Sequence, residues 1–120
     1  MTIERQELGK AGETRAVEEL TRRGYAVLAQ RYRTRHGEID IVADDGGTVV
    51  FVEVKVRRTA EMGTAAEAVT PAKQRRLVSL AVESRARLGL HERPCRFDVI
   101  AIDGEGATER LVHYEHAFIR

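Results

Sequence analysis

Apolar residues recur every three or four positions in two stretches of the chain, and this spacing is typical of amphipathic helices. The first stretch covers residues 4–23 and ends at Gly24. The second follows Thr70 and Pro71, which suit an N-cap and a first helical turn, and it ends at Gly89. The sequence therefore predicts two helices, one at the N-terminus and one in the second half of the chain.

Between and after these helices, apolar runs of strand length are separated by turns rich in glycine and aspartate. The third run is apolar on both faces apart from Glu53 and Lys55, so we expect it in the centre of a sheet. The turn at 44–47 predicts an antiparallel hairpin with the strand before it. The predicted strands cover 25–33, 37–43, 49–56, 96–103 and an edge strand at 110–116. The order α-β-β-β-α-β-β indicates an α/β layer fold.

Composition narrows the class of protein further. Of the 120 residues 42% are hydrophobic, which favours a single folded domain over residues 1–120. No apolar run approaches the roughly 20 residues of a membrane span, and the first residues are charged where a signal peptide would be apolar. We therefore expect a cytoplasmic protein without membrane association. The net charge of +1, from 20 basic and 19 acidic residues, does not by itself indicate a polyanionic partner.

Two charges interrupt the central strand. Period-two alternation places Glu53 and Lys55 on one face together with Val49 and Phe51. A buried carboxylate is stable only when it is paired, hydrogen-bonded or bound to a cation. One interpretation is a structural ion pair at a strand end. The other is a functional site, and the residues of the preceding strand help to decide between them.

Asp40 lies in that preceding strand, and we expect it on the face opposite Ile39 and Ile41, where the hairpin would bring it across from Glu53. Oxygen ligands of this kind suit Mg²⁺, and a nearby lysine can stabilise the charge on a phosphate. Glu13 follows Gly9 and Gly12 in the first helix, and two helical glycines indicate a close approach to the sheet that would direct Glu13 to the same place. The alternative for Glu13 is a solvated helix charge.

At these residues the sequence resembles the PD-(D/E)xK nuclease superfamily, with Asp40 as the aspartate and 53–55 as the ExK element. Segments along nearly the whole chain are also similar to the bacterial YraN family of endonuclease-like proteins. They are 9–25, 37–43, 51–55, Lys73 with Leu77, 96–100 and 117–118. Ile39 replaces the proline of the superfamily motif, and Arg31 stands where the family pattern leads us to expect asparagine.

The resemblance implies a restriction endonuclease-like fold, with a mixed five-stranded sheet flanked by helices, and a metal-dependent active site. Asp40, Glu53 and the backbone carbonyl of Val54 would bind Mg²⁺ or Mn²⁺. Lys55 would orient the attacking water, and Glu13 would act through water or a second metal. The implied catalytic residues are therefore Glu13, Asp40, Glu53 and Lys55.

Basic residues cluster in segments that contain no acid, where they would bind backbone phosphates or remain on a solvated surface. One segment lies between Glu19 and Glu38, one follows the ExK element, and one begins the second helix. The superfamily also uses a polar residue from that helix. The candidate nucleic-acid contacts are Arg31, Arg33, Arg35, Arg57, Arg58, Lys73, Gln74 and Arg76. Asp98, which follows Phe97, is more typical of a strand end or a cap than of a ligand.

These observations predict a nuclease that hydrolyses phosphodiester bonds in nucleic acid, DNA rather than RNA, with branched or repair intermediates as candidate substrates. A homodimer would suit a two-fold symmetric substrate. Two alternatives stay open from the sequence. One is a catalytically inactive module on the same fold that binds nucleic acid or docks a partner, and the other is a structural protein with a coincidental ion-pair cluster.

Overall fold

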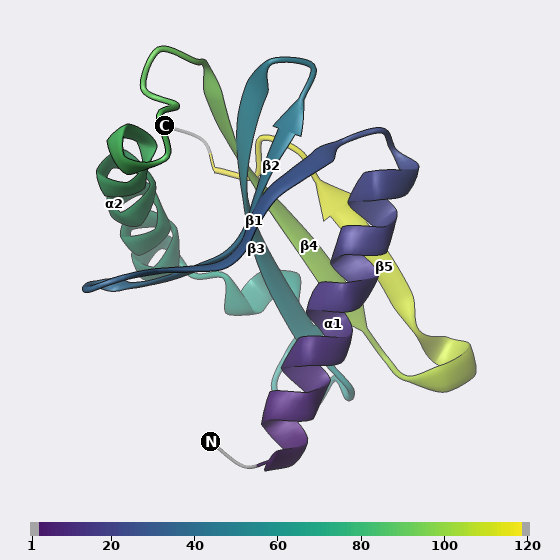
Figure 1. Ribbon diagram of the computed structural model, residues 1–120. Helices are drawn as coiled ribbons and strands as arrows, with labels where there is room; N and C mark the ends of the chain where they lie inside the picture. Colours follow the sequence, from purple (N-terminus) through teal and green to yellow (C-terminus); the bar gives the residue numbers. More distant parts are fainter. Residues whose placement is uncertain (1–2, 119–120) are drawn as a thin grey trace.

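The computed structural model describes residues 3–118 and contains a five-stranded sheet with a long helix on each face (Figure 1). The order of elements matches the prediction from the sequence, with two short 3-10 turns, η1 and η2, added in the loops. The elements are α1 (Ile3–Arg22), β1 (Ala26–Thr34), β2 (Gly37–Asp45), β3 (Thr48–Arg57), η1 (Ala66–Ala68), α2 (Pro71–Arg87), β4 (Cys95–Asp103), η2 (Gly106–Thr108) and β5 (Arg110–Tyr114).

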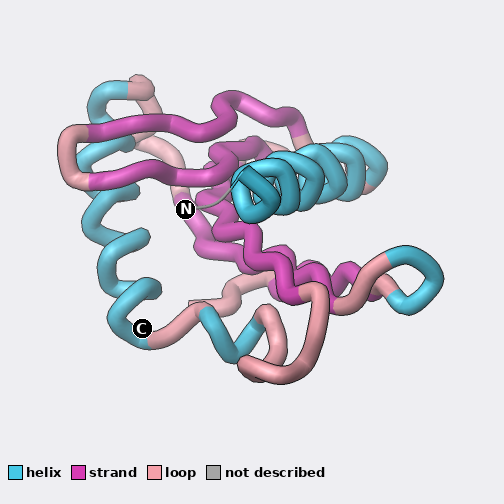
Figure 2. Tube along the Cα trace, turned by 90° about the horizontal axis from the view of Figure 1, so that it is seen from below, coloured by secondary structure: helices cyan, strands magenta, loops and turns pink. Residues whose placement is uncertain are grey.

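The strands lie in the order β1-β2-β3-β4-β5, so β3 is central and β5 is an edge strand, as predicted. Neighbouring strands pair antiparallel except β3 and β4, which are parallel. A parallel pair needs a long crossover connection, and α2 provides it. Figure 2 shows the strands passing between the two helices. The mixed sheet and the α/β class are therefore confirmed.

Two apolar layers hold the helices on the sheet. Ala16 and Leu20 of α1 pack on Ile41, Val52 and Ile100. On the other face, α2 buries Leu77, Leu80 and Ala81 against residues that include Ile39, Phe51 and Val99. Within residues 3–118, neither helix combines the length and the apolar character that a membrane crossing demands.

The tip of the β1–β2 hairpin reaches across to α2 (Figures 1 and 2). Arg76 of α2 donates a hydrogen bond to the carbonyl of His36 at 3.3 Å, and His36 Nδ1 lies 3.0 Å from a carboxylate oxygen of Glu83. A Cβ at Gly37 would lie 2.8 Å from the Arg76 guanidinium and 3.2 Å from Leu80, so glycine permits this approach. The hairpin and α2 are therefore fixed against each other.

The two glycines of α1 have different surroundings. A Cβ at Gly12 would lie 2.4 Å from a methyl group of Val56, so the expected close approach of helix and sheet is confirmed there. A Cβ at Gly9 would have nothing within 4 Å, so the same interpretation is wrong for Gly9. Gly9 instead borders an open cleft beside the helix.

Strand β2 reverses its facing at Asp40, which corrects the prediction that Ile39 and Ile41 share a face. Ile39 packs in the layer under α2, whereas Ile41 packs in the layer under α1. The pairing of β2 with β3 ends at Ile41 opposite Val52. Beyond that point the carboxylate of Asp40 accepts a hydrogen bond from the backbone N–H of Val54 at 2.9 Å. The Asp40 side chain thus accepts a hydrogen bond from a backbone N–H of β3 just beyond the last paired residues of β2 and β3.

Asp98 is also corrected, because it is fully buried in the middle of β4 rather than at a strand end. Its carboxylate accepts two hydrogen bonds from Arg96 at 2.9 Å and lies 2.7 Å from Nε2 of His113. The Arg96 guanidinium also donates to the hydroxyl of Tyr25 at 2.7 Å and to the carboxylate of Asp45 at 3.0 Å. Asp98 therefore anchors a polar network inside the sheet.

Candidate metal centre at the end of the β2–β3 ladder

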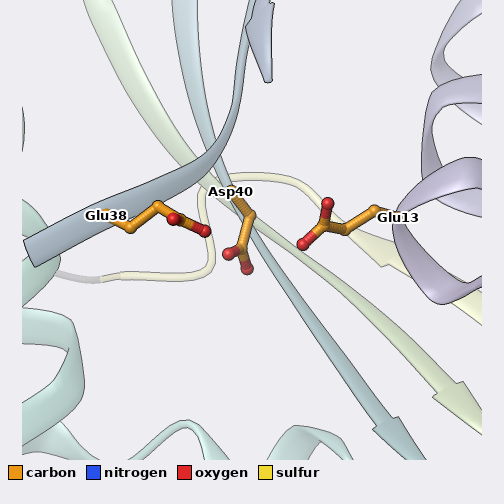
Figure 3. Close-up of side chains that lie close together, drawn as sticks. All are labelled: Glu13, Glu38 and Asp40. Carbon is orange, nitrogen blue, oxygen red and sulfur yellow. The ribbon is translucent and has the colours of Figure 1, made fainter. Parts of the chain in front are cut away.

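Three carboxylates converge where the pairing of β2 and β3 ends. Glu13 of α1 and Glu38 of β2 point toward Asp40 from opposite sides (Figure 3). One carboxylate oxygen from each of the three residues lies within 4.8 Å of the others. The prediction that α1 brings Glu13 to Asp40 therefore agrees with the geometry.

Glu38 is the member of this cluster that the sequence analysis missed. It lies near the end of a basic, polar hairpin, where the sequence gives a glutamate that serves a site the same pattern as a solvated charge. Only the fold shows that Glu38 contributes a third carboxylate.

Asp40 and Glu53 occupy the buried part of the site. Burial raises the pKa of Asp40, although the hydrogen bond from Val54 opposes this effect. Burial, together with the charge of Asp40, raises the pKa of Glu53 to about 8. Two adjacent carboxylates in such an environment do not both ionise readily unless a cation compensates them. A cation bound near Asp40 and Glu53 would therefore favour the ionised form of both carboxylates.

Lys55 follows Glu53 on the same face of β3 and is half-buried. Burial lowers the pKa of Lys55, and the neighbouring charges of Lys73 and Arg57 lower it further. A partly desolvated ammonium beside carboxylates is suited to a phosphate oxygen or a water molecule. The structure thus brings together the four predicted catalytic residues, Glu13, Asp40, Glu53 and Lys55.

Two hollows meet at Glu53 and Lys55, which border both. The first, on the α1 side, has a volume of about 520 Å³. It is lined by Leu8, Gly9, Glu13, Asp40, Glu53, Val54, Lys55, Val56 and Arg57. The second, on the α2 side, has a volume of about 250 Å³ and is bordered by Glu38 and by residues of α2. The carboxylates therefore lie between two openings of the surface.

Arg31 is part of the acidic cluster rather than a free contact for nucleic acid. Its guanidinium lies 2.6 Å from the carboxylate of Glu13. Its backbone φ of +50° is in the left-handed region, where asparagine is more easily accommodated than arginine. The neighbouring Arg33 pairs with Glu38 at 3.2 Å but stays largely exposed. Both arginines compensate acids of the site in this structure.

The other residues that were predicted to contact nucleic acid lie in different parts of the structure. Arg35 is exposed at the hairpin tip, and Arg57 lines the hollow on the α1 side. Lys73 and Arg76 line the hollow on the α2 side. Two residues lie apart from the carboxylates: Arg58 pairs with Glu105 at 3.0 Å, and Gln74 donates to the carbonyl of Val69 at 3.1 Å and borders a different hollow.

The donor set fits a hard divalent cation. Glu13, Glu38, Asp40 and Glu53 offer only carboxylate oxygens, which are the ligands that Mg²⁺ and Mn²⁺ prefer. Burial raises the pKa of both Asp40 and Glu53, so a bound cation would favour their ionised forms. For Val54, the structure shows its N–H bound to Asp40, and its carbonyl as a metal ligand stays a prediction.

Comparison with known proteins identifies the family. The model of the uncharacterised protein family UPF0102 matches residues 12–102. A UPF0102 protein of Symbiobacterium thermophilum is 55% identical over 96 residues, covering 80% of this chain and 81% of the relative. One of Pelotomaculum thermopropionicum is 42% identical over 120 residues, covering 98% and 100% of the two chains. The resemblance to the YraN-type family is thereby confirmed, and the chain belongs to the UPF0102 family.

Proposed function

We propose that this protein is a metal-dependent nuclease that hydrolyses phosphodiester bonds in DNA, as a member of the PD-(D/E)xK superfamily would. One observation carries the proposal. Asp40, Glu53 and Lys55, which interrupt apolar strands, meet Glu13 at the point where β2 and β3 stop pairing. A structural role alone would not require two adjacent, partly buried carboxylates, Asp40 and Glu53, beside an open cleft.

The carboxylates of Asp40 and Glu53 would hold Mg²⁺ or Mn²⁺, with Glu13 and Glu38 completing the acidic surroundings directly or through water. The cation supplies an acidified water and neutralises charge on the phosphate. The N–H of Val54 fixes the orientation of Asp40 through its hydrogen bond. Partial burial of this pair would strengthen its attraction for a cation, because charges interact more strongly where the local dielectric is low.

Lys55 would act on the substrate itself. Its ammonium can donate hydrogen bonds to a phosphate oxygen or orient the attacking water, and its partial burial leaves it poorly hydrated. Arg57 on the α1 side, and Lys73 with Arg76 on the α2 side, would bind phosphates on either side of the scissile bond.

The proposal is tested by cleavage of branched, flapped and single-stranded DNA in Mn²⁺ by the wild type and two variants. Asp40→Asn and Lys55→Ala should each lower the cleavage rate at least about 100-fold, because each removes a group that acts in the transition state. Glu61→Gln, on an exposed loop, is the matched control and should cleave at the wild-type rate. Equal cleavage by all four proteins would contradict the assignment.

The position of Arg31 supports one alternative, an inactive module that binds DNA on the same fold. Its guanidinium already compensates Glu13, as a bound cation otherwise would. The assay above separates the two functions. DNA binding without cleavage in Mg²⁺ or Mn²⁺ would favour the inactive module.

A further inference from the structure

The hollow on the α2 side, called here the α2-side pocket, combines an apolar floor with a cationic rim. Val69, Leu77 and Leu80 line it, and all three have only small exposed fractions. Lys55, Lys73 and Arg76 also line it, and the aliphatic stems of these side chains add apolar surface to the walls. Glu38 and Glu53 lie on the side that faces the acidic cluster.

This combination selects among ligands. A metal ion gains nothing from an apolar floor, and an apolar peptide gains nothing from three cations. A nucleotide presents both an apolar base face, which packs on apolar side chains, and an anionic phosphate, which basic side chains bind. The volume of about 250 Å³ is large enough for a single base.

Hydrogen bonds position the Arg76 side chain and the backbone of Lys73 beside the α2-side pocket. Arg76 is tied to the carbonyl of His36 in the hairpin tip, at 3.3 Å. Lys73 lies in the first turn of α2, where the hydroxyl of Thr70 accepts a hydrogen bond from its backbone N–H at 3.3 Å. The N-terminal end of this helix carries partial positive charge and adds to the attraction for phosphate.

The α2-side pocket is also continuous with the candidate metal centre, because Glu53 and Lys55 line both hollows. A phosphodiester held at the carboxylates would place the neighbouring nucleotide at the opening of the pocket. A base that is paired and stacked in a duplex cannot reach the floor of the α2-side pocket unless it leaves the stack.

We propose that the α2-side pocket binds an unpaired DNA base next to the scissile phosphate, so that the substrate carries an unpaired nucleotide, as a flap, fork or gap does. This inference rests on the proposed nuclease function and specifies its substrate class. Lys73 and Arg76 bind the phosphate of that nucleotide, and Val69, Leu77 and Leu80 contact its base.

The test measures binding separately from cleavage. Fluorescence anisotropy in Ca²⁺, which takes the same oxygen ligands as Mg²⁺, gives the Kd for a fully paired duplex and for the same duplex with a one-nucleotide flap. The wild type should bind the flapped DNA at least about tenfold more tightly, because an unpaired base can make apolar contacts that a paired base cannot. Lys73→Glu should reduce this preference to about twofold or less. Arg75→Glu makes the same charge change two positions along α2, outside the pocket lining, and should retain the preference.

A second pair of variants tests whether the apolar floor of the α2-side pocket contacts the base. Leu80→Trp fills the α2-side pocket and should abolish the preference for flapped DNA, whereas Val82→Trp on the exposed side of α2 should not. Equal affinity of the wild type for both DNAs, or a preference that survives Lys73→Glu and Leu80→Trp, would overturn the inference. If the protein cleaves DNA in Mn²⁺ but binds flapped and fully paired DNA equally, the proposed base binding is contradicted and the nuclease function is not. If it prefers flapped DNA but cleaves none, the nuclease function is contradicted and base binding is supported.

Discussion

Glu53 shows how the candidate site lowers the stability of the protein that contains it. Burial and the charge of Asp40 raise the pKa of Glu53 to about 8, and burial raises the pKa of Asp40 as well. Both shifts mean that the ionised forms are less favourable in the folded chain than in the unfolded chain. Sites that bind cations commonly carry this cost, which the bound ion then removes.

Replacing Glu53 should therefore stabilise the metal-free protein. We expect Glu53→Gln to raise the free energy of unfolding at pH 8.5 by about 1–2 kcal/mol, because one of two repelling carboxylates is lost. The same variant should lose most of the rise in Tm that Mn²⁺ gives the wild type. Thermal unfolding with and without Mn²⁺ measures both effects.

Glu19→Gln is the control for this experiment, since Arg22 and Arg23 lower the pKa of Glu19 to about 2 and its charge is favourable. It should lower stability slightly and leave the effect of Mn²⁺ unchanged. A Glu53→Gln protein that is less stable than the wild type without metal would show that the carboxylate pair is not repulsive.

The sequence indicated some residues of the candidate site clearly and others not at all. Asp40, Glu53 and Lys55 interrupt apolar strands, so each stood out against the hydrophobic pattern. Glu38 and Arg31 lie in a polar segment, where a charge that serves the site has the same pattern as a charge in solvent. Their roles depend on the path of the β1–β2 hairpin, which local patterning does not encode.

At the scale of the elements, α1 shows that a glycine in a helix does not by itself predict a close contact with the sheet. Both Gly9 and Gly12 suggested a close helix–sheet contact, and their spacing of three residues places them on the same side of the helix. Gly12 contacts Val56, but Gly9 lies one turn nearer the N-terminus, where the cleft separates α1 from the sheet. Strand β2 gives a second case. The period-two rule assumes an uninterrupted ladder, and β2 reverses its facing where the carboxylate of Asp40 takes the N–H of Val54.

The two glycines make a matched pair for mutation. Gly12→Ala should destabilise the protein by about 1 kcal/mol, because overpacking against the stiff Val56 side chain exceeds the gain in helix propensity. Gly9→Ala should stabilise it by about 0.5–1 kcal/mol, because only the propensity gain remains. Urea unfolding of both variants gives the comparison. Stabilisation by Gly12→Ala would mean that α1 moves away from β3 at little cost.

At the scale of the whole molecule, the two hollows contain different mixtures of charge. Three acids and two bases line the hollow on the α1 side, whereas two acids and three bases line the α2-side pocket. Glu53 and Lys55 belong to both linings. The net charge of +1 does not reveal this distribution, because 20 basic and 19 acidic residues nearly cancel. Total charge was therefore uninformative, whereas the order of elements predicted the layers that create the two sides.

Asp98 links the sheet across several strands, and its pKa gives a prediction for the whole fold. Burial alone raises the pKa of Asp98, but hydrogen bonds from His113 and Arg96 outweigh it, so the pKa lies below the usual range. The ionised carboxylate is thus favoured by folding. This contribution is fully present above the unfolded pKa of about 3.9 and is lost as the pH falls through the lower folded value.

Asp98→Asn should consequently destabilise the protein by about 3 kcal/mol at pH 7, because it leaves the Arg96 guanidinium buried with weaker partners. The difference from the wild type should shrink as the pH is lowered below about 4, because the unfolded chain then binds a proton at Asp98 before the folded chain does. Asp45→Asn, at the more exposed end of the network, should cost less at every pH. Urea unfolding between pH 2.5 and pH 7 tests the series. A difference between Asp98→Asn and the wild type that is constant over this range would mean that the network stabilises the sheet by its shape and not by its charge.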